Sequence, residues 1–183
     1  MVLNGRGDDN RISHKTQQKI HDYVRSVNYF PNSLARGLSS GKSRTIGLII
    51  PDIANRFYAR IAHRIELKAK SYGYQVIYSS SLEDSNLEAK LIDTMLQRQV
   101  EGLIIASTQE NQQEMQRLLR ANFPFVLFDR HYPGLDTNYV IVENAEGVGR
   151  AVYHLQVHGR HNPAFVTIRS GLEAMNQRRK GFE

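Results

Sequence analysis

Asp129 is the residue of this sequence best placed for ligand chemistry. It directly follows the apolar stretch 124–128, and small ligands bind beyond the carboxyl ends of strands in open α/β sheets. A carboxylate there can accept two hydrogen bonds from neighbouring hydroxyl groups of one ligand. The alternative is a turn or capping carboxylate, because strand ends favour Asp for backbone reasons alone. Ser107 and Thr108, which follow the stretch 102–106, can add hydroxyl groups to the same site.

Three further candidates follow the first long apolar stretch, 45–50. Ile53, Asn55 and Phe57 can line a ligand cleft with apolar and amide surface at the same edge of the sheet. For Asn55 the alternative is a structural role only, because Asn is a preferred capping residue for the first turn of a helix.

The sequence gives little support for metal binding or catalysis. His154 and His158 are four residues apart, with His161 nearby, and such a pair on one helix face can chelate a metal. No carboxylate or cysteine lies beside them, so we predict no metal. The chain also has no GxGxxG, no P-loop and no nucleophile elbow. We therefore expect a protein that is not an enzyme and uses no cofactor.

Composition indicates an ordinary globular chain. The 183 residues are 40% hydrophobic and 23% charged, with no cysteine, so disulfides and thiolate chemistry are excluded. No apolar run approaches the roughly 18 residues of a membrane span, and the N-terminus lacks a signal-peptide pattern. We expect a cytoplasmic protein with no membrane partner.

The net charge of +6 is unevenly distributed. Residues 1–44 hold eight Lys or Arg and three Asp or Glu, so five of the six net positive charges precede residue 45. Such asymmetry is typical of a chain that meets nucleic-acid phosphates at one end, although a solvated basic tail is the alternative.

The elements expected from the pattern form an α/β fold. Ser13 can cap a helix over 14–28, with Ile20, Val24 and Val27 as its buried stripe. From residue 45, strands predicted at 45–50, 74–79, 102–106, 124–128 and 139–142 alternate with helices capped by Asn55, Asp84 and Asn144. This alternation predicts a parallel, Rossmann-type sheet with helices on both faces. A further strand at 164–168 and a helix from about Leu172 would begin a second lobe.

A short segment joins the basic region to this sheet. Pro31 ends the first helix, and Asn32 can cap a helix of about two turns, which is too short to be stable alone in water. Leu34 and Leu38 share one face of it, with the small Ala35 beside them. Two copies could pack together there and insert a leucine between base pairs from the minor groove.

The motif PNxxARGL, a Gly/Ser/Lys linker and then TIGLIIPDIAN together resemble the hinge and core entry of the LacI/GalR family of bacterial transcription repressors. Within the family, the segments 2–7, 98–102 and 126–130 look most like the fructose and sucrose operon repressors. The likeness runs the length of the chain, and it implies that helices before residue 2 and most of a second lobe after residue 183 are missing, as in a fragment.

The resemblance implies roles on the DNA side. Asn4, Tyr29 and Asn32 match positions that contact the DNA backbone, and Leu38 matches the minor-groove wedge, with Ala35 packed beside it. Arg36 would attract phosphates without discriminating bases. The alternatives are a core ring of the headpiece for Tyr29 and an ordinary apolar helix residue for Leu38.

The resemblance also implies an effector site. Asp129 matches the family's effector-contacting aspartate, and Arg178 matches its cationic partner, which can pair with a hydroxyl, carboxylate or phosphate. For Arg178 the alternative is a surface helix charge. The implied domain plan is a partial helix-turn-helix headpiece (1–31), a hinge helix and linker (32–44), a periplasmic-binding-protein-like first lobe (45–160) and the start of a second (161–183).

These observations favour a repressor of carbohydrate genes that binds operator DNA as a homodimer or tetramer and responds to a sugar or sugar phosphate. A periplasmic-type sugar-binding protein is one alternative. The other is a non-functional or dominant-negative remnant, for which uncovered apolar faces would make solubility poor.

Overall fold

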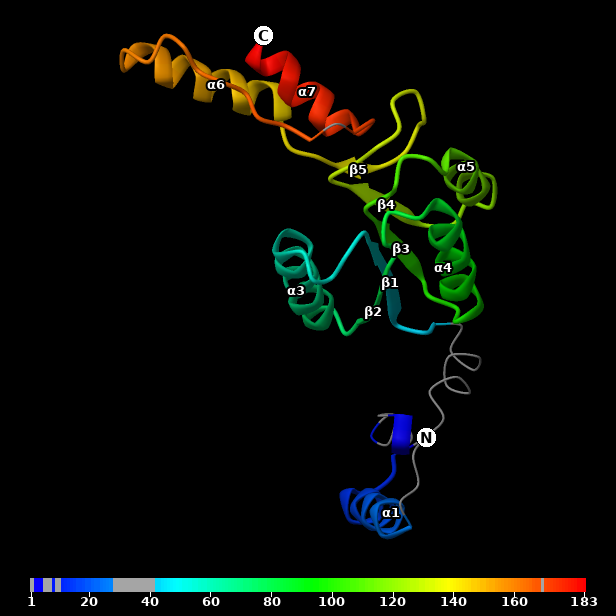
Figure 1. The fold of residues 1–183 in the computed structure, drawn as a ribbon. Helices are drawn as coiled ribbons and strands as arrows, with labels where there is room; N and C mark the ends of the chain where they lie inside the picture. The colour runs from blue at the N-terminus through cyan, green and yellow to red at the C-terminus, as the bar shows by residue number, and fades with distance from the viewer. Residues whose placement is uncertain (1, 5–7, 9–10, 28–41, 169) are drawn as a thin grey trace. The chain divides into compact units, whose positions relative to one another are not determined.

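The computed structural model describes residues 2–4, 8, 11–27, 42–168 and 170–183. The chain forms two compact units, Met1–Ser43 and Arg44–Glu183 (Figure 1). In neither unit does a helix of the described residues have the length and apolar character needed to cross a membrane.

The described residues of the first unit form a 3-10 helix, η1 (Val2–Asn4), and an α-helix, α1 (His14–Ser26). Ser13 caps α1 as predicted, since its hydroxyl accepts a hydrogen bond from the backbone N–H of Thr16 at 3.3 Å. The predicted buried stripe is wrong: α1 has no buried residue, and Val27 is half exposed. A helix face is buried only by another element, and the described part of this unit contains no second α-helix.

The second unit is built on a parallel sheet with strand order β2-β1-β3-β4-β5, which confirms the predicted α/β fold. The strands are β1 (Thr45–Ile50), β2 (Gln75–Ser80), β3 (Gly102–Ile105), β4 (Phe125–Phe128) and β5 (Tyr139–Val140). β5 ends two residues earlier than predicted, because its partner β4 ends at Phe128, opposite Val140.

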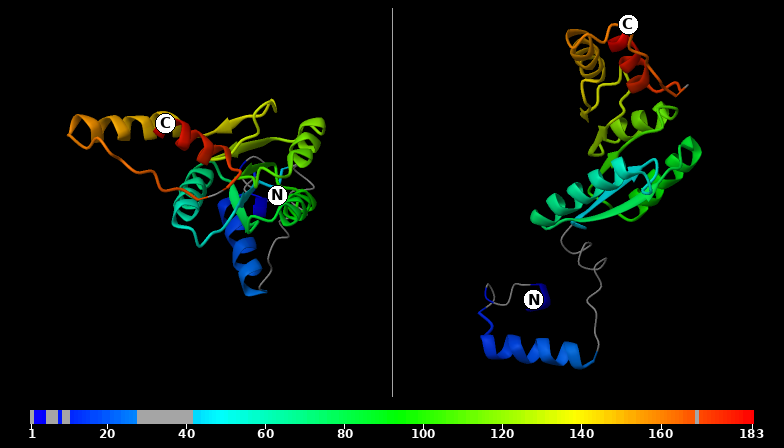
Figure 2. Two further views of the ribbon diagram at one scale, coloured as in Figure 1. Left: turned by 45° about the horizontal axis from the view of Figure 1, so that its top comes forward. Right: turned by 60° about the vertical axis from the view of Figure 1, so that its left-hand side comes forward.

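Helices cover both faces of the sheet (Figures 1 and 2). α3 (Arg56–Ser71) lies on one face, and α4 (Ser85–Gln97) and α5 (Gln112–Arg120) lie on the other. The caps predicted for α3 and α4 are confirmed. Asn55 accepts a hydrogen bond from the N–H of Phe57 at 2.9 Å, and Asp84 accepts one from the N–H of Asn86 at 2.8 Å.

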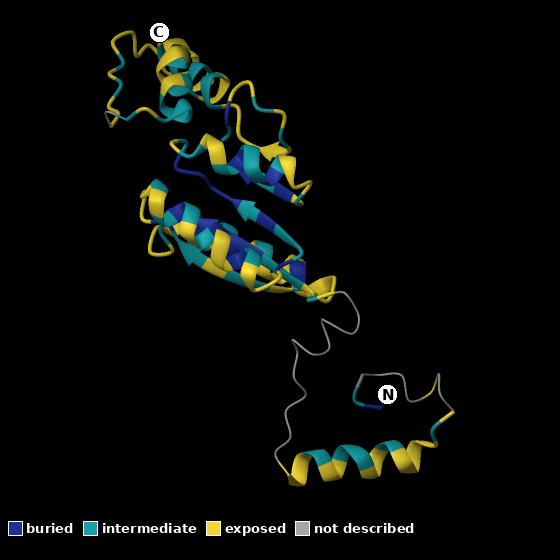
Figure 3. Ribbon diagram, turned by 90° about the vertical axis from the view of Figure 1, so that its right-hand side faces the viewer, coloured by how far each residue is buried: buried dark blue, intermediate teal, exposed yellow. Residues whose placement is uncertain are grey.

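Each helical layer has its own core because side chains of a strand alternate between the two faces. Leu48 and Ile50 of β1 pack with Tyr58 and Ala62 of α3. Ile49, between them, belongs to the cluster on the opposite face, which includes residues of α4 and α5. Buried residues concentrate in the sheet and in the helix faces that touch it (Figure 3).

The last two helices, α6 (Asn144–Val157) and α7 (Glu173–Phe182), pack against each other rather than on the sheet (Figures 1 and 2). This differs from the layer expected for α6. The cap predicted at Asn144 is also wrong: Asn144 is the first helical residue, and its amide oxygen accepts a hydrogen bond from Nε of Arg178 in α7 at 2.7 Å. The amide links two helices instead of capping one.

The strand predicted at 164–168 does not form. A strand is stabilised by pairing, and none of the described strands lies beside this segment. Val166 is 93% exposed, while the ring of Phe165 stacks on Phe182 of α7 with centroids 5.2 Å apart. The helix expected from about Leu172 is present as α7.

Candidate functional site

A pocket of about 720 Å³ opens at the carboxyl ends of the strands. Its walls come from the loops after β1, β2 and β4, the first turn of α3, the segment that leads into α7, and α7 itself. The lining residues are Pro51, Asp52, Asn55, Phe57, Tyr58, Leu82, Glu83, Asp129, Arg130, Ile168, Leu172, Ala174, Met175 and Arg178. Charged groups from several elements therefore converge on a partly apolar cavity, as in sites for small polar ligands.

A larger hollow of about 930 Å³ lies elsewhere, along the surface of α3. Only residues of that helix line it, from Arg56 to Lys68, and several are long cationic side chains. It lacks the convergence of groups from different elements, so the strand-end pocket is the better candidate site.

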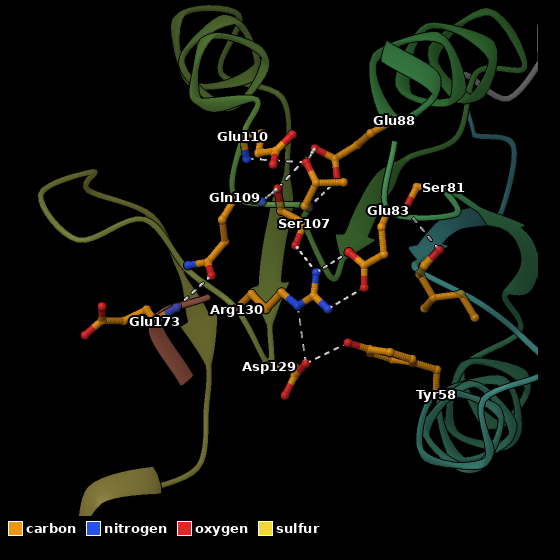
Figure 4. Close-up of polar contacts among 12 residues, drawn as sticks. Tyr58, Ser81, Glu83, Glu88, Ser107, Gln109, Glu110, Asp129, Arg130 and Glu173 are labelled. Atoms are coloured by element: carbon orange, nitrogen blue, oxygen red, sulfur yellow. Dashed lines mark hydrogen bonds and ion pairs between the residues drawn. The ribbon is translucent and has the colours of Figure 1, made fainter. Parts of the chain in front are cut away.

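Arg130 is the central cation of the pocket (Figure 4). Its side chain is only 6% exposed and forms a two-point ion pair with Glu83, at 2.6 Å from Nη1 and 2.7 Å from Nη2. Nη1 also donates to the carbonyl oxygen of Ser107 at 3.2 Å. Burial is the largest single effect and lowers the pKa of Arg130, but the hydrogen bonds to Glu83 and the nearby charges of Glu83 and Asp129 together raise it above its ordinary value, so the group stays charged.

Asp129 lies beside this cation and is held on two sides. Its backbone N–H donates to the carbonyl oxygen of Val140 at 2.9 Å, and its φ of 62° is left-handed, which Asp tolerates better than most residues. Its Oδ2 accepts a hydrogen bond from the hydroxyl of Tyr58 at 2.8 Å and lies 3.8 Å from Nε of Arg130. Within the described chain Oδ1 has no protein hydrogen-bond partner, so it is available to a ligand.

The hydroxyl of Tyr58 is a permanent donor. Burial raises the pKa of Tyr58, and the hydrogen bond to the Asp129 carboxylate raises it further. The hydroxyl of Tyr58 is therefore protonated near neutral pH, and its hydrogen bond holds one carboxylate oxygen of Asp129 in a fixed direction.

Behind the pocket lies a buried carboxylate, Glu88 of α4. It accepts hydrogen bonds from the N–H of Thr108 at 2.8 Å and from the hydroxyl of Ser107 at 3.1 Å. The same Ser107 hydroxyl lies 2.7 Å from that of Tyr132. Burial raises the pKa of Glu88, although these hydrogen bonds act in the opposite direction. The network fixes the loop after β3, whose Ser107 carbonyl holds Arg130.

One polar contact joins α7 to the loop after β3, and another joins it to α6. The N–H of Glu173 donates to the side-chain oxygen of Gln109 at 3.1 Å, and Arg178 is held by its Nε on Asn144. Within the described residues the two terminal nitrogens of Arg178 have no protein partner. They are therefore available to a ligand in the pocket.

The structure brings together four of the predicted effector residues, Asn55, Phe57, Asp129 and Arg178, in the lining of one pocket. Ile53 does not line it and is 37% exposed. Ser107 does not line it either, because its hydroxyl is fully buried in the network around Glu88.

The lining residues that sequence reasoning did not single out include the three that form the polar contacts around Asp129 and its neighbour: Tyr58, Glu83 and Arg130. Arg130 comes directly after Asp129, and Glu83 comes shortly after a predicted strand. For both residues, the position along the chain could therefore have indicated that they lie at the pocket. The signal for Tyr58 was weaker, since it lies inside a helix, one position after Phe57.

On the DNA side only Asn4 lies in the described chain, at the end of η1. Tyr29, Asn32, Ala35, Arg36 and Leu38 lie outside the described residues. The ring centroids of His154 and His158 lie 4.2 Å apart, with the ring planes tilted by 39°. The part of the chain that the structure covers contains no group of three or more His, Cys, Asp or Glu side chains suited to a metal ion.

Comparison with known proteins identifies relatives of both the sequence and the fold. Over 130 residues the chain is 39% identical to the catabolite repressor/activator of Escherichia coli (strain K12) and 36% identical to the sucrose operon repressor of Klebsiella pneumoniae. These matches cover 70% and 71% of this chain but only 39% of each relative. The matched part of the chain thus covers well under half the length of these two relatives.

Among solved structures, the chain is similar to the Cra transcriptional dual regulator from Pseudomonas putida in complex with fructose 1-phosphate. The identity is 28% and the TM-score 0.69, over 76% of this chain and 52% of that one. Residues 43–183 also match the model of the family described as periplasmic binding proteins and sugar binding domain of the LacI family. The chain belongs to this family, and the predicted resemblance to LacI-type repressors, including those of the fructose and sucrose type, is confirmed.

Proposed function

We propose that this chain is part of a DNA-binding repressor of carbohydrate metabolism genes whose operator binding is controlled by a sugar phosphate. The observation that carries the proposal is the strand-end pocket. There, Oδ2 of Asp129 lies beside Arg130 while Oδ1 has no hydrogen-bond partner among the described residues, and Arg178 lines the same cavity.

The pocket chemistry suits a ligand with both hydroxyl and anionic groups. Oδ1 of Asp129 can accept hydrogen bonds from sugar hydroxyls, and two guanidinium groups can bind phosphate oxygens. Phe57 is 49% exposed and offers apolar surface for a sugar ring. The relative from Pseudomonas putida was crystallised with fructose 1-phosphate, which makes this molecule the first probe to use.

The DNA side of the proposal rests on the charge distribution and the hinge motif. The excess of basic residues before residue 45 supports binding to phosphates. In this proposal Asn4, Tyr29 and Asn32 contact the DNA backbone, Arg36 attracts phosphates, and Leu38 inserts into the minor groove with Ala35 packed beside it. The complete regulator works in the cytoplasm as a homodimer or tetramer, performs no catalysis and requires no cofactor.

Effector binding is tested by calorimetry with the full-length protein. Fructose 1-phosphate should bind, and fructose should bind at least about tenfold more weakly because it lacks the anionic group. Replacing Asp129→Asn should weaken both ligands, since the amide accepts fewer hydrogen bonds than the carboxylate. Equal affinity for the sugar and its phosphate would contradict the role of the two arginines.

Control of DNA binding is tested by fluorescence anisotropy with operator DNA from the gene's own promoter. Affinity should fall steeply with salt and should change when fructose 1-phosphate is added, because a regulator couples two binding equilibria. Replacing Leu38→Asp should abolish specific binding. An exported, monomeric protein whose ligand binding is unaffected by DNA would instead favour a periplasmic-type sugar-binding protein.

A further inference from the structure

The guanidinium of Arg130 is already occupied by a carboxylate of the protein. Nη1 and Nη2 both donate to Glu83, Nη1 also donates to the Ser107 carbonyl, and Nε faces Asp129 at 3.8 Å. Figure 4 shows Glu83 and Asp129 approaching the guanidinium from different directions. An anionic ligand group therefore cannot form a two-point contact with Arg130 unless the Glu83 carboxylate leaves.

The Glu83 side chain can leave Arg130 without a movement of the backbone between β2 and α4. The backbone on either side is fixed: the N–H groups of Ser81 and Leu82 donate to the carbonyl oxygens of Ile50 and Pro51, each at 2.8 Å, and Asp84 caps α4. The Glu83 side chain itself is 54% exposed. Rotation about its side-chain bonds would place the carboxylate in water, where a charge is well solvated.

Arg130, in contrast, does not move with it. Its side chain is 6% exposed, and the Ser107 carbonyl and the Asp129 carboxylate remain beside it when Glu83 departs. A buried, oriented guanidinium then faces the pocket, and this is an arrangement suited to two-point recognition of an oxyanion.

We propose that Glu83 is a specificity-determining residue whose carboxylate occupies Arg130 in the absence of ligand and competes with the anionic group of the effector. The inference rests on the proposed function for the presence of that anionic group. A phosphate carries a charge of about −1.5 to −2 near pH 7 and offers three oxygens, so it can displace a singly charged carboxylate. A neutral sugar has no group that can do so. Glu83 thus allows sugar phosphates, but not sugars, to bind the guanidinium of Arg130.

The experiment measures the dissociation constants of fructose 1-phosphate, fructose and inorganic phosphate for full-length protein. The variants are Glu83→Gln, which removes the competing charge at equal size, and Glu83→Asp, which keeps the charge on a side chain one methylene shorter. Asp52→Asn is the matched control, because it removes one carboxylate from the same pocket and Asp52 forms no ion pair with Arg130.

For Glu83→Gln, affinity for both phosphates should rise roughly fivefold to tenfold, because the fraction of protein with Arg130 available increases. Affinity for fructose should be unchanged. Glu83→Asp should give a smaller gain, and Asp52→Asn should give a gain well below that of Glu83→Gln.

The inference is overturned if neither phosphate binds Glu83→Gln more tightly than the wild type, or if Asp52→Asn gives an equal gain. If Glu83→Gln bound both phosphates more weakly than the wild type, Glu83 would only orient Arg130, and the inference would be wrong. Suppose that inorganic phosphate binds Glu83→Gln more tightly than the wild type, while fructose 1-phosphate binds neither the wild type nor any variant. Then Glu83 does compete with anions for Arg130, but the proposed effector class is wrong. If fructose 1-phosphate binds the wild type without any gain in Glu83→Gln, the proposed effector class stands and the competition is wrong.

Discussion

Replacing Tyr58 by phenylalanine removes one hydroxyl group from the centre of the pocket. That hydroxyl is the only group in the described chain that donates a hydrogen bond to the Asp129 side chain, at 2.8 Å. Tyr58 is 4% exposed, so the ring remains packed against β1 and β4 in the variant. The change therefore isolates a single polar interaction.

Its magnitude follows from the burial of the two groups. A hydrogen bond to a charged acceptor contributes about 1.5–3 kcal/mol to stability. The Asp129 side chain is 16% exposed, so water can replace part of the lost bond, and Nε of Arg130 stays 3.8 Å from the same oxygen. We therefore expect Tyr58→Phe to lower the free energy of unfolding by about 1–2 kcal/mol.

The assay is urea denaturation of the wild type, Tyr58→Phe, Asp129→Ala and the double variant. The left-handed φ of Asp129 penalises Ala, but this cost is the same with or without the Tyr58 hydroxyl, so it cancels in the cycle. The coupling energy should be about 1 kcal/mol or more. Tyr78→Phe is the matched control, because Tyr78 is 58% exposed, and it should have little effect. Additive losses, with no coupling, would refute the role of the Tyr58–Asp129 bond.

Three further changes test the packing and the buried charge. Gly47→Ala should destabilise the fold by about 1–3 kcal/mol in urea denaturation, because a Cβ would lie 2.5 Å from Cδ2 of Leu103; an unchanged midpoint would contradict this packing. Gly181→Ala should separate α6 from α7, since a Cβ would clash with the carbonyl oxygen of Ala145, and limited proteolysis should then cleave that region faster than in the wild type. Burial raises the pKa of Glu88 above its ordinary value of 4.5, so the folded state binds the proton more tightly than the unfolded state. Stability due to this group should therefore fall as the pH rises from 4.5 through the raised pKa, and Glu88→Gln should remove that slope; a pH-independent difference between the two proteins would exclude it.

The features predicted correctly from the sequence depend on short stretches of chain. Apolar runs located the five strands, and Asn55 and Asp84 were identified as caps because a cap bonds to N–H groups two or three residues away. Asp129 was placed at the pocket because a residue that directly follows a strand lies at its carboxyl end wherever that strand falls in the sheet.

The features that were missed depend on the order of strands, which the local pattern does not contain. Glu83 follows β2 and Arg130 follows β4, 47 residues later, and β1 and β3 lie between these strands in the sheet. The pair forms because two long side chains reach across those strand ends. The errors at α1, α6 and 164–168 have a related cause: an apolar stripe or strand needs a partner, and its own sequence does not say which element supplies one.

The adjacent residues Asp129 and Arg130 show how one strand end can serve two recognition tasks. The left-handed φ of Asp129 interrupts the extended backbone after β4, and the two side chains reach different partners, Tyr58 of α3 and Glu83 after β2. Asp129 keeps one oxygen without a partner in the described chain, whereas Arg130 has its terminal nitrogens occupied. In the proposed function, Oδ1 of Asp129 is therefore ready for a hydroxyl group before a ligand arrives, whereas an anionic group can make a two-point contact with Arg130 only after the Glu83 carboxylate leaves. In the proposed function a ligand with hydroxyl groups alone satisfies only the first task, so a sugar phosphate is distinguished from a sugar by Arg130 with its Glu83 partner and by Arg178, rather than by Asp129.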